Sequence, residues 1–413
     1  MKFNLLKISS YLGIFLIFSG SSYYLFSQLI PVSSTKHSES NNSNTPTSAD
    51  QKKTGIISFS GPKTEVCPLN GVLYTREEKA VWSQRRPLMV MIENHADSRP
   101  QSGLQNADIV YEAVAEGGIT RFMAVFYCGA VKGADQKYDV GPVRSARTYF
   151  LDLASEYSDA PLYTHVGGAN CSAATTGGSC TTNKKALALE QIDSYGWTKK
   201  GTWSDLSEFS LSYKACRREP DRIGDGVVRA TEHTMYCNSS ELWNVASDRG
   251  LTNITQANSN SWDKNYRSWN FSQKDVASSS PIAGASFDFW SGYKDYSVNW
   301  KYDVSNNIYS RLNGGQAHID FNTQQPITTK NVVIQFVKET RSVDEHLHNL
   351  YDVIGSGKGV LMQNGTKQDI TWTKSNRTSR TVFRDSSGKE VNFVPGQIWI
   401  EILPINNAIN YEG

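Results

Sequence analysis

The chain has 413 residues, of which 38% are hydrophobic and 20% charged, and its formal net charge is +2 at pH 7. A charge this close to zero lacks the basic excess of nucleic-acid-binding proteins and of polybasic membrane patches, so both classes are excluded. The roughly 350 residues beyond the N-terminal region suffice for two hydrophobic cores on length grounds.

The N-terminal region has the pattern of a membrane anchor. Residues 8–30 carry no charged side chain and follow Lys2 and Lys7, which predicts a single-pass anchor over residues 1–30 with its N-terminus in the cytoplasm. A cleavable secretory signal is the alternative, because the most apolar part is short. Either interpretation places everything after about residue 30 outside the cytoplasm, and the retained anchor would also hold it at the cell membrane. Residues 31–60 have few apolar side chains and are predicted to form a disordered tether.

Six cysteines follow the tether, at positions 67, 128, 171, 180, 216 and 237. An even number in an exported protein favours three disulfides. Proximity suggests Cys171–Cys180 and Cys216–Cys237, which leaves Cys67–Cys128, although sequence alone permits other pairings. No pair has the spacing of a zinc knuckle, and neither a metal site nor a cofactor is predicted. The absence of a cysteine before Cys67 excludes a lipid-modified N-terminal cysteine.

Residues 61–251 are predicted to form a first domain that mixes helices and strands. Thr75 with Glu78 three residues later is a capping box, which predicts a helix over residues 76–84. Apolar residues at helical spacing predict a second helix over residues 143–157. Four runs of strand length lie between polar or turn residues, at 87–92, 108–115, 119–127 and 161–166.

Residues 252–282 are rich in Asn, Ser and Gln and are predicted to form the loop between two domains. Beyond them, alternating and aromatic runs separated by Asn, Asp and Gly turns predict a smaller domain over residues 283–413 that is mainly β. The predicted fold class is therefore α+β, with a mixed sheet-and-helix N-terminal domain followed by a mainly-β C-terminal domain.

Several blocks of residues resemble a known family. Those at 90–95, 103–112, 116–122 and 141–147 together resemble the N-terminal domain of the YerB-like lipoprotein family, and later blocks resemble its C-terminal domain. The resemblance spans roughly residues 65–405 and implies a two-domain surface protein of the bacterial envelope, without an established activity. Two features depart from the family pattern, namely the predicted transmembrane anchor in place of a lipid anchor and the six cysteines.

Eight polar residues of the first domain are candidate site residues, and several of them fall where a predicted strand or hairpin meets a loop, which is where scaffolds present binding side chains. They are Glu93, Asn94, Glu116, Arg121, Arg144, Ser145, Arg147 and His165. Arg144 and Arg147 lie near the start of the predicted helix, where free N–H groups favour anions. We therefore expect a pocket in which these arginines bind a carboxylate or phosphate, oriented by Glu93 or Glu116. The alternative is an internal network in which the acids and arginines only pair with each other.

The sequence patterns that would indicate catalysis are weaker than those that indicate binding. Ser145, His165 and Asp108 have the residue types of a triad, but no Gly-x-Ser-x-Gly elbow surrounds Ser145. Glu112 and Glu116 are expected on one face of a strand about 13 Å apart, which is too far for a glycosidase pair.

Four histidines beyond His165 also need an interpretation. His346 and His348 have the spacing of a metal pair, but no third ligand is evident, and surface positions are expected for both. His233, which precedes a predicted helix near residues 239–249, and His318 are expected to be structural partners.

The leading hypothesis is an exported, membrane-tethered binding or adaptor protein of the cell envelope, with an anion-accepting cleft in the first domain. Its partners would be the membrane, through the N-terminal helix, and an envelope polymer or envelope protein, with no nucleic acid. One rival hypothesis is a hydrolase of envelope glycan or peptide that uses Glu93 or His165. The other is a purely structural assembly platform.

Overall fold

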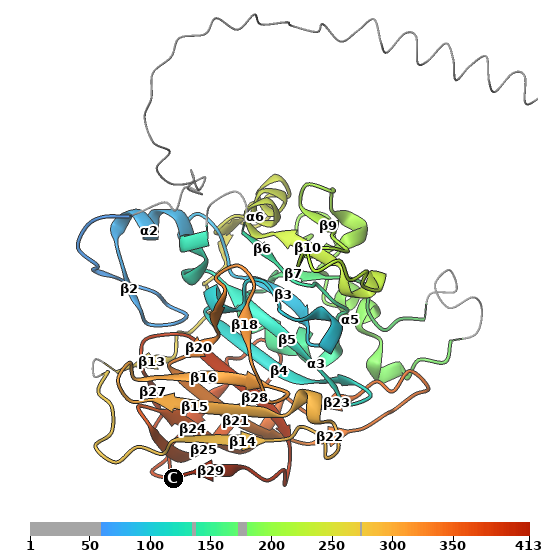
Figure 1. Ribbon diagram of the computed structural model, residues 1–413. Coiled ribbons are helices and arrows are strands. Elements are labelled where there is room, and N and C mark those ends of the chain that lie inside the picture. Colours follow the sequence, from blue (N-terminus) through green and yellow to red (C-terminus); the bar gives the residue numbers. More distant parts are fainter. Residues whose placement is uncertain (1–58, 134–137, 172–179, 273–274) are drawn as a thin grey trace, which may run out of the picture. The chain divides into compact units, whose positions relative to one another are not determined.

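A ten-stranded sheet contains strands from both halves of the chain (Figure 1). The computed structural model describes residues 59–133, 138–171, 180–272 and 275–413. In spatial order the sheet consists of β26 (Val382–Arg384), β25 (Thr366–Lys374), β24 (Gly355–Gln363), β21 (Asn331–Val337), β28 (Ile398–Pro404), β4 (Ile109–Glu116), β5 (Ile119–Phe126), β3 (Leu88–Glu93), β7 (Leu162–His165) and β8 (Asp205–Ser207). The halves meet where β28 pairs in parallel with β4, from Ile398 opposite Ile109 to Glu401 opposite Glu112.

The segments predicted as separate domains therefore share one sheet, and Thr54–Gly413 form one compact unit. The predicted boundaries at 61–251, 252–282 and 283–413 stay predictions. The predicted fold class is confirmed, because helices and mixed strands make up the first part and strands dominate the second.

The remaining elements form smaller sheets and four α-helices within the described residues. A mainly antiparallel sheet in the second half contains β17 (Gln316–Ala317), β16 (Ile308–Asn313), β15 (Val298–Asp303), β14 (Gly284–Phe287) and β29 (Asn410–Glu412), with β20 (Thr328–Thr329) beside β16. A three-stranded sheet contains β6 (Asp139–Val140), β10 (Met235–Asn238) and β9 (Cys216–Arg218). The helices are α2 (Arg76–Trp82), α3 (Thr148–Ala154), α5 (Ala188–Ser194) and α6 (Ser239–Asp248). Two-stranded pairs are β1 (Glu65–Val66) with β2 (Leu73–Tyr74), β11 (Ile254–Thr255) with β12 (Asn260–Ser261), β13 (Asn270–Phe271) with β27 (Asn392–Phe393), β18 (Ile319–Asp320) with β19 (Gln325–Pro326), and β22 (Glu339–Thr340) with β23 (Leu350–Tyr351).

Residues 1–58 include the predicted anchor at 1–30 and most of the predicted tether at 31–60, and they lie outside the described residues. Within the described part of the chain, no helix has the length and apolar character that a membrane crossing requires. The anchor and the tether stay predictions.

The central strands of the large sheet are covered on both faces. On one face, Trp300 of β15 packs edge-on against Trp399 of β28, with ring centroids 5.3 Å apart. Glu112 of β4 also points to this face. Its neighbour Tyr111 points to the opposite face, where its hydroxyl lies 2.8 Å from that of Tyr157, just beyond α3. The sheet is thus enclosed between the antiparallel sheet and the α3 region.

Helix α3 begins at Thr148, five residues later than the predicted start. Residues 143–147 are not helical because their backbone bonds to strands on two sides. The N–H of Arg144 donates to the carbonyl of Met91 in β3 at 2.9 Å, and the carbonyl of Arg144 accepts from the N–H of Val166 after β7 at 3.1 Å. The predicted position of Arg144 near a helix start is therefore wrong. Such long-range pairing overrides local helical spacing.

Glu112 and Glu116 lie on opposite faces of β4, which corrects the expectation that they share one face. The register between β4 and β5 shifts between Val114 and Glu116, as a β-bulge does. Glu112 contacts Arg311 in the antiparallel sheet, whereas Glu116 contacts Arg121 on the α3 side. The pair is still unsuited to glycosidase chemistry, now because the sheet separates the two carboxylates.

The three disulfides of the structure are the predicted ones, Cys67–Cys128, Cys171–Cys180 and Cys216–Cys237. The first ties the segment after β1 to the end of β5, and the third joins β9 to β10. Disulfides stabilise mainly by restricting the unfolded chain. All three lie within residues 61–251, which also supply most of the residues of the candidate site.

Candidate ligand-binding site

Six of the eight predicted site residues gather around the extended segment at 143–147. They are Glu93, Glu116, Arg121, Arg144, Ser145 and Arg147. Glu93 ends β3 opposite Arg121 of β5, and the bulge in β4 turns Glu116 to the same side of the sheet. The fold thus assembles these side chains from four separate stretches of sequence.

Two arginines share one carboxylate at the centre of this group. Arg121 and Arg147 contact opposite oxygens of Glu116 at 2.6 and 2.5 Å. Burial disfavours the ionised Glu116, but the charges and hydrogen bonds of the two guanidinium groups lower its pKa below the usual value. Two cations against one anion leave one positive charge. The Nε atoms of both arginines are buried without a hydrogen-bond partner among the described residues.

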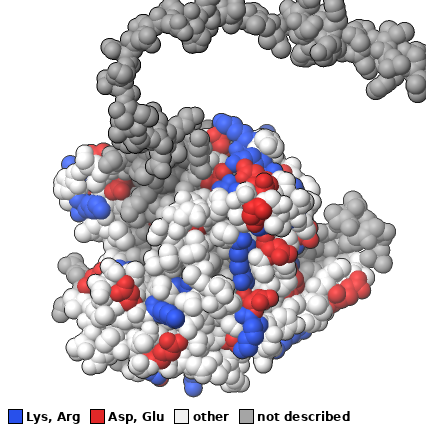
Figure 2. Space-filling model, viewed as in Figure 1, with Lys and Arg blue, Asp and Glu red and all other residues white. Residues whose placement is uncertain are grey.

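Arg144 belongs to a different pair. Its Nε donates to Glu93 at 3.0 Å, and the second oxygen of Glu93 lies 2.8 Å from Nδ1 of His233. Arg144 and Arg147 therefore bind different carboxylates, although they are three residues apart. Figure 2 shows the same mixing of charge on one face of the molecule, where acidic and basic side chains lie interspersed.

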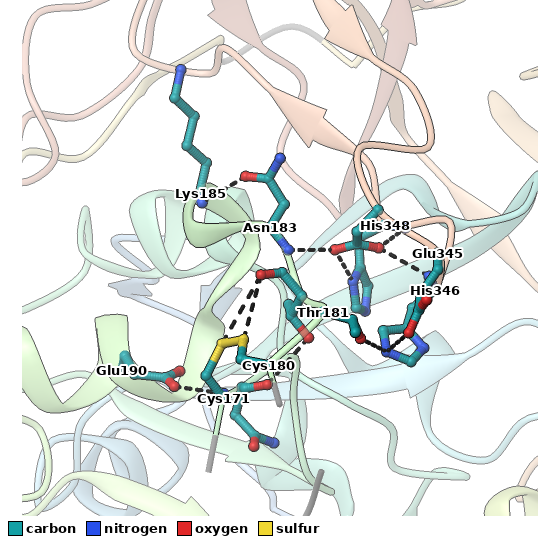
Figure 3. Close-up of a disulfide and its surroundings, with 12 residues drawn as sticks. Cys171, Cys180, Thr181, Asn183, Lys185, Glu190, Glu345, His346 and His348 are labelled. Carbon is teal, nitrogen blue, oxygen red and sulfur yellow. Dashed lines mark hydrogen bonds and ion pairs between the residues drawn. A yellow bond between two sulfur atoms is a disulfide. The ribbon is translucent and has the colours of Figure 1, made fainter. Parts of the chain in front are cut away.

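A cavity of about 490 Å³ opens beside Arg147. Its other lining residues are Ser145, Gly168, Ala169, Asn170, Thr181, Thr182, Glu345, His346 and His348. Figure 3 shows how the second half contributes: His346 lies next to Thr181, which follows the Cys171–Cys180 disulfide, with Oγ1 of Thr181 and Nε2 of His346 3.3 Å apart. We refer to this cavity as the Arg147 cleft. Its lining combines hydroxyl groups, imidazoles, a guanidinium group and the carboxylate of Glu345.

Comparison with known proteins identifies the family. Residues 71–252 match the model described as "Protein of unknown function (DUF3048) N-terminal domain", and residues 286–400 match the corresponding C-terminal domain. The chain belongs to the DUF3048 family. "Putative lipoprotein YerB" of Bacillus subtilis (strain 168) is 28% identical to this DUF3048 protein over 350 residues, which cover 82% of this chain and 86% of the relative. The predicted resemblance to YerB-like proteins is confirmed.

The fold is also similar to a solved structure. The crystal structure of YerB protein from Bacillus subtilis matches this DUF3048 protein with a TM-score of 0.62 at 25% identity, covering 84% of this chain and 100% of that one. The similarity therefore includes both halves and the sheet that joins them.

The two histidines of the Arg147 cleft differ from each other in solvent exposure. His346 is exposed, as predicted, but His348 is buried, and its Nδ1 lies 2.9 Å from Oδ2 of Asp344. The predicted surface position of His348 is therefore wrong, because residues 344–348 fold against the first half. Burial and the charge of Arg147 lower the pKa of His348. A neutral imidazole thus lines the cleft.

Ser145, His165 and Asp108 do not form a triad. Both ring nitrogens of His165 are engaged, Nε2 with Asp205 at 2.7 Å and Nδ1 with the carbonyl of Gly167 at 2.6 Å. The carboxylate of Asp108 instead accepts hydrogen bonds from the backbone N–H groups of Tyr127 and Gly129, just beyond β5. His165 consequently has no free nitrogen with which to activate a serine.

Asn94 faces away from the cleft, in a buried network that sequence reasoning missed. Its amide donates to Thr120 at 2.7 Å. The same network includes the ion pair between Glu112 and Arg311, whose side chains are fully buried. Glu401, within an apolar strand, also lies in it. An acid inside an apolar run needs a buried partner, which is the signal that could have revealed the network.

The pair of His165 and Asp205 predicts a dependence of stability on pH. Burial disfavours the charged imidazole of His165, but the hydrogen bond and charge of Asp205 raise its pKa above the usual value. The folded state therefore holds this proton more tightly than the unfolded state. The stabilisation is fully present below about pH 6.5 and is lost as the pH rises through the raised pKa.

We expect Asp205→Asn to lower the melting temperature more at about pH 6 than at about pH 9, because the contribution of the pair is complete below the ordinary pKa of histidine and declines as the pH rises through the raised pKa of His165. Melting curves of both proteins across this range measure the difference. An equal effect at both ends would mean that the pair is not ionised in the folded protein.

Proposed function

We propose that this protein is a membrane-held, extracytoplasmic binding or adaptor protein of the cell envelope whose Arg147 cleft accepts an anionic ligand. The observation that carries the proposal is the cleft itself, in which Arg121 and Arg147 share Glu116 next to a cavity of about 490 Å³. Guanidinium groups bind phosphate and carboxylate through paired hydrogen bonds. The two guanidinium groups on the single carboxylate of Glu116 favour an anion at this end of the cavity, whereas the exposed Glu345 places a negative charge elsewhere in the lining.

The lining indicates the class of ligand. Hydroxyl groups of Ser145, Thr181 and Thr182 surround the cleft, together with the exposed imidazole of His346. Hydroxyl and imidazole groups both donate and accept hydrogen bonds, as sugar hydroxyls require of a partner. We therefore propose a phosphate-bearing glycan polymer of the envelope as the ligand.

Three observations support the location. The relative from Bacillus subtilis is named as a lipoprotein, residues 1–30 have the pattern of a membrane anchor, and the chain contains three disulfides. Disulfides persist in oxidising compartments outside the cytoplasm. Together they support a protein that is held at the membrane and exposed to the envelope.

We favour binding over hydrolysis because Glu93 and His165, the residues that a hydrolase would use, already have hydrogen-bonding partners in the protein. Both oxygens of Glu93 contact cations or imidazole, namely Arg144 and His233, and both nitrogens of His165 have partners. A general acid or base needs a free position toward the substrate.

Co-sedimentation tests the function. The full-length chain in detergent is mixed with insoluble cell wall that carries a phosphate-bearing polymer, and with the same wall after removal of that polymer. We expect sedimentation with the first wall only, weaker sedimentation for Ser145→Ala, and wild-type behaviour for Ser305→Ala, an exposed serine in another part of the chain. Equal sedimentation of both serine variants would contradict binding of the polymer in the Arg147 cleft. Progressive release of soluble wall fragments would favour the hypothesis that the protein is a hydrolase.

A further inference from the structure

Three side chains that ligate metals converge at the end of β3, outside the Arg147 cleft. His95 and Asp97 lie at the short turn Ala96–Ser98, and His233 precedes β10. One ligand atom from each lies within 4.8 Å of the other two. The imidazoles of His95 and His233 stack with centroids 4.7 Å apart. Residues 138 positions apart in the sequence thus meet at one point.

The spacing suits one metal ion. Nδ1 of His95 lies 3.6 Å from Oδ2 of Asp97. Two ligands of a tetrahedral zinc ion with bonds near 2.1 Å lie roughly 3.4 Å apart. Nδ1 of His95 also accepts the backbone N–H of Asp97 at 3.3 Å, and the plane of its ring lies 11° from parallel to that of His233. To bind one ion, the exposed Asp97 side chain must shift and the partly exposed His95 ring must turn, which exchanges the N–H contact for a metal bond.

Glu93 orients His233 as carboxylates do in metal sites. Its Oε2 lies 2.8 Å from Nδ1 of His233, and Arg144 holds the other oxygen. A carboxylate on one ring nitrogen fixes the imidazole and presents the other nitrogen to a metal. Nε2 of the buried His233 has no hydrogen-bond partner within the described ranges, so it is the nitrogen available to an ion.

The charge around the group is negative. Glu93, Asp97 and Glu232 provide three carboxylates, and Glu232 interacts electrostatically with both imidazoles. Two guanidinium groups oppose them, that of Arg144 and that of Arg229, which donates from Nε to the carbonyl of Asp97 at 3.0 Å and pairs with Asp225. Carboxylates therefore outnumber guanidinium groups around the site. Asp97 is exposed, which gives an ion access from solvent. Three protein ligands would leave a coordination position for water or for a ligand atom.

We propose that His95, Asp97 and His233 form a binding site for a divalent transition-metal ion, with Glu93 as the outer carboxylate. Two imidazoles and one carboxylate match the preference of Zn²⁺, which also binds in tetrahedral geometry. This site goes beyond the proposed function and does not depend on the Arg147 cleft.

Metal titration tests the site. A chelator first removes metal ions from the full-length chain in detergent. The chain is then titrated with Zn²⁺, followed by calorimetry, and separately with Co²⁺, followed by visible absorption. We expect one equivalent to bind. His95→Ala and Asp97→Asn should each weaken binding by at least about tenfold, and Glu93→Gln, which removes the orienting carboxylate, by about 10- to 100-fold.

His346→Ala is the matched control, because the other pair of neighbouring histidines lies in the cleft. It should leave Zn²⁺ affinity unchanged. His95 and Asp97 are partly or fully exposed, so their variants should fold, which melting curves without metal verify. Absence of Zn²⁺ binding, unchanged affinity in His95→Ala, or loss of binding in His346→Ala would each overturn the proposal.

Discussion

Replacing Arg311 by methionine will lower the free energy of unfolding by about 3–5 kcal/mol, because it leaves a buried carboxylate without its cation. Arg311 contacts Glu112 at 2.5 Å and His318 at 2.9 Å, and the side chains of Arg311, Glu112 and Glu401 are fully buried. Burial and the charge of Glu112 raise the pKa of Glu401. Glu112 is the carboxylate nearer to Arg311, at 2.5 Å against 3.8 Å for Glu401.

Urea denaturation of the two proteins measures this effect. Lys338→Met is the control, since Lys338 pairs with Asp352 at 3.5 Å on the surface, where both side chains are more than half exposed. Exposed pairs contribute about 0–1 kcal/mol. If Arg311→Met destabilises no more than Lys338→Met, the buried pair does not hold the two sheets together.

Replacing Glu116 by glutamine will have the second largest effect. The substitution leaves Arg121 and Arg147 buried with no carboxylate between them. We expect it to lower the free energy of unfolding by about 3 kcal/mol. This value is at the low end for breaking a buried ion pair, because the side chain of Glu116 is 22% exposed. Phosphate should restore part of this stability, because an anion can occupy the place of the carboxylate.

We measure the stability that phosphate restores by comparing melting temperatures of wild type and Glu116→Gln. Each protein is melted in sodium chloride and in sodium phosphate of equal ionic strength. Phosphate stabilises proteins in general, so the decisive quantity is its additional effect on the variant. Glu390→Gln, which removes the partner of Arg380 elsewhere, should gain nothing beyond wild type. Equal phosphate effects in all three proteins would show that the two arginines do not accept an anion.

Features with local causes could be predicted from the sequence. The capping box of Thr75 and Glu78 begins α2, because both of its hydrogen bonds form within one turn. The strands β3, β4 and β5 follow from mainly apolar runs of strand length that are buried on both faces, although β4 contains Glu112 and β5 contains Arg121. Proximity suggests the Cys171–Cys180 and Cys216–Cys237 disulfides, and an even cysteine count then leaves Cys67–Cys128 by elimination.

Features that depend on distant partners could not be predicted. The helix expected over 143–157 begins late because Arg144 bonds to strands at Met91 and Val166. His348 reaches the cleft from a loop 203 positions beyond Ser145, and β28 pairs with β4 across 289 positions. Periodicity describes one segment at a time and says nothing about which segments meet. The residue types of the site were therefore predictable, while their partners were not.

The central claim is that the Arg147 cleft binds an anion rather than only holding the fold together. Calorimetric titration with a soluble phosphate-bearing wall fragment into wild type, Arg147→Ala and Arg144→Ala tests it most directly. Arg147 lines the cleft, whereas Arg144 pairs with Glu93 outside its lining. We predict that Arg147→Ala weakens binding by roughly tenfold or more, as loss of a charged hydrogen bond should, and that Arg144→Ala binds like wild type. Unchanged affinity in Arg147→Ala, with only its melting temperature lowered, would contradict the account and leave an internal salt-bridge network.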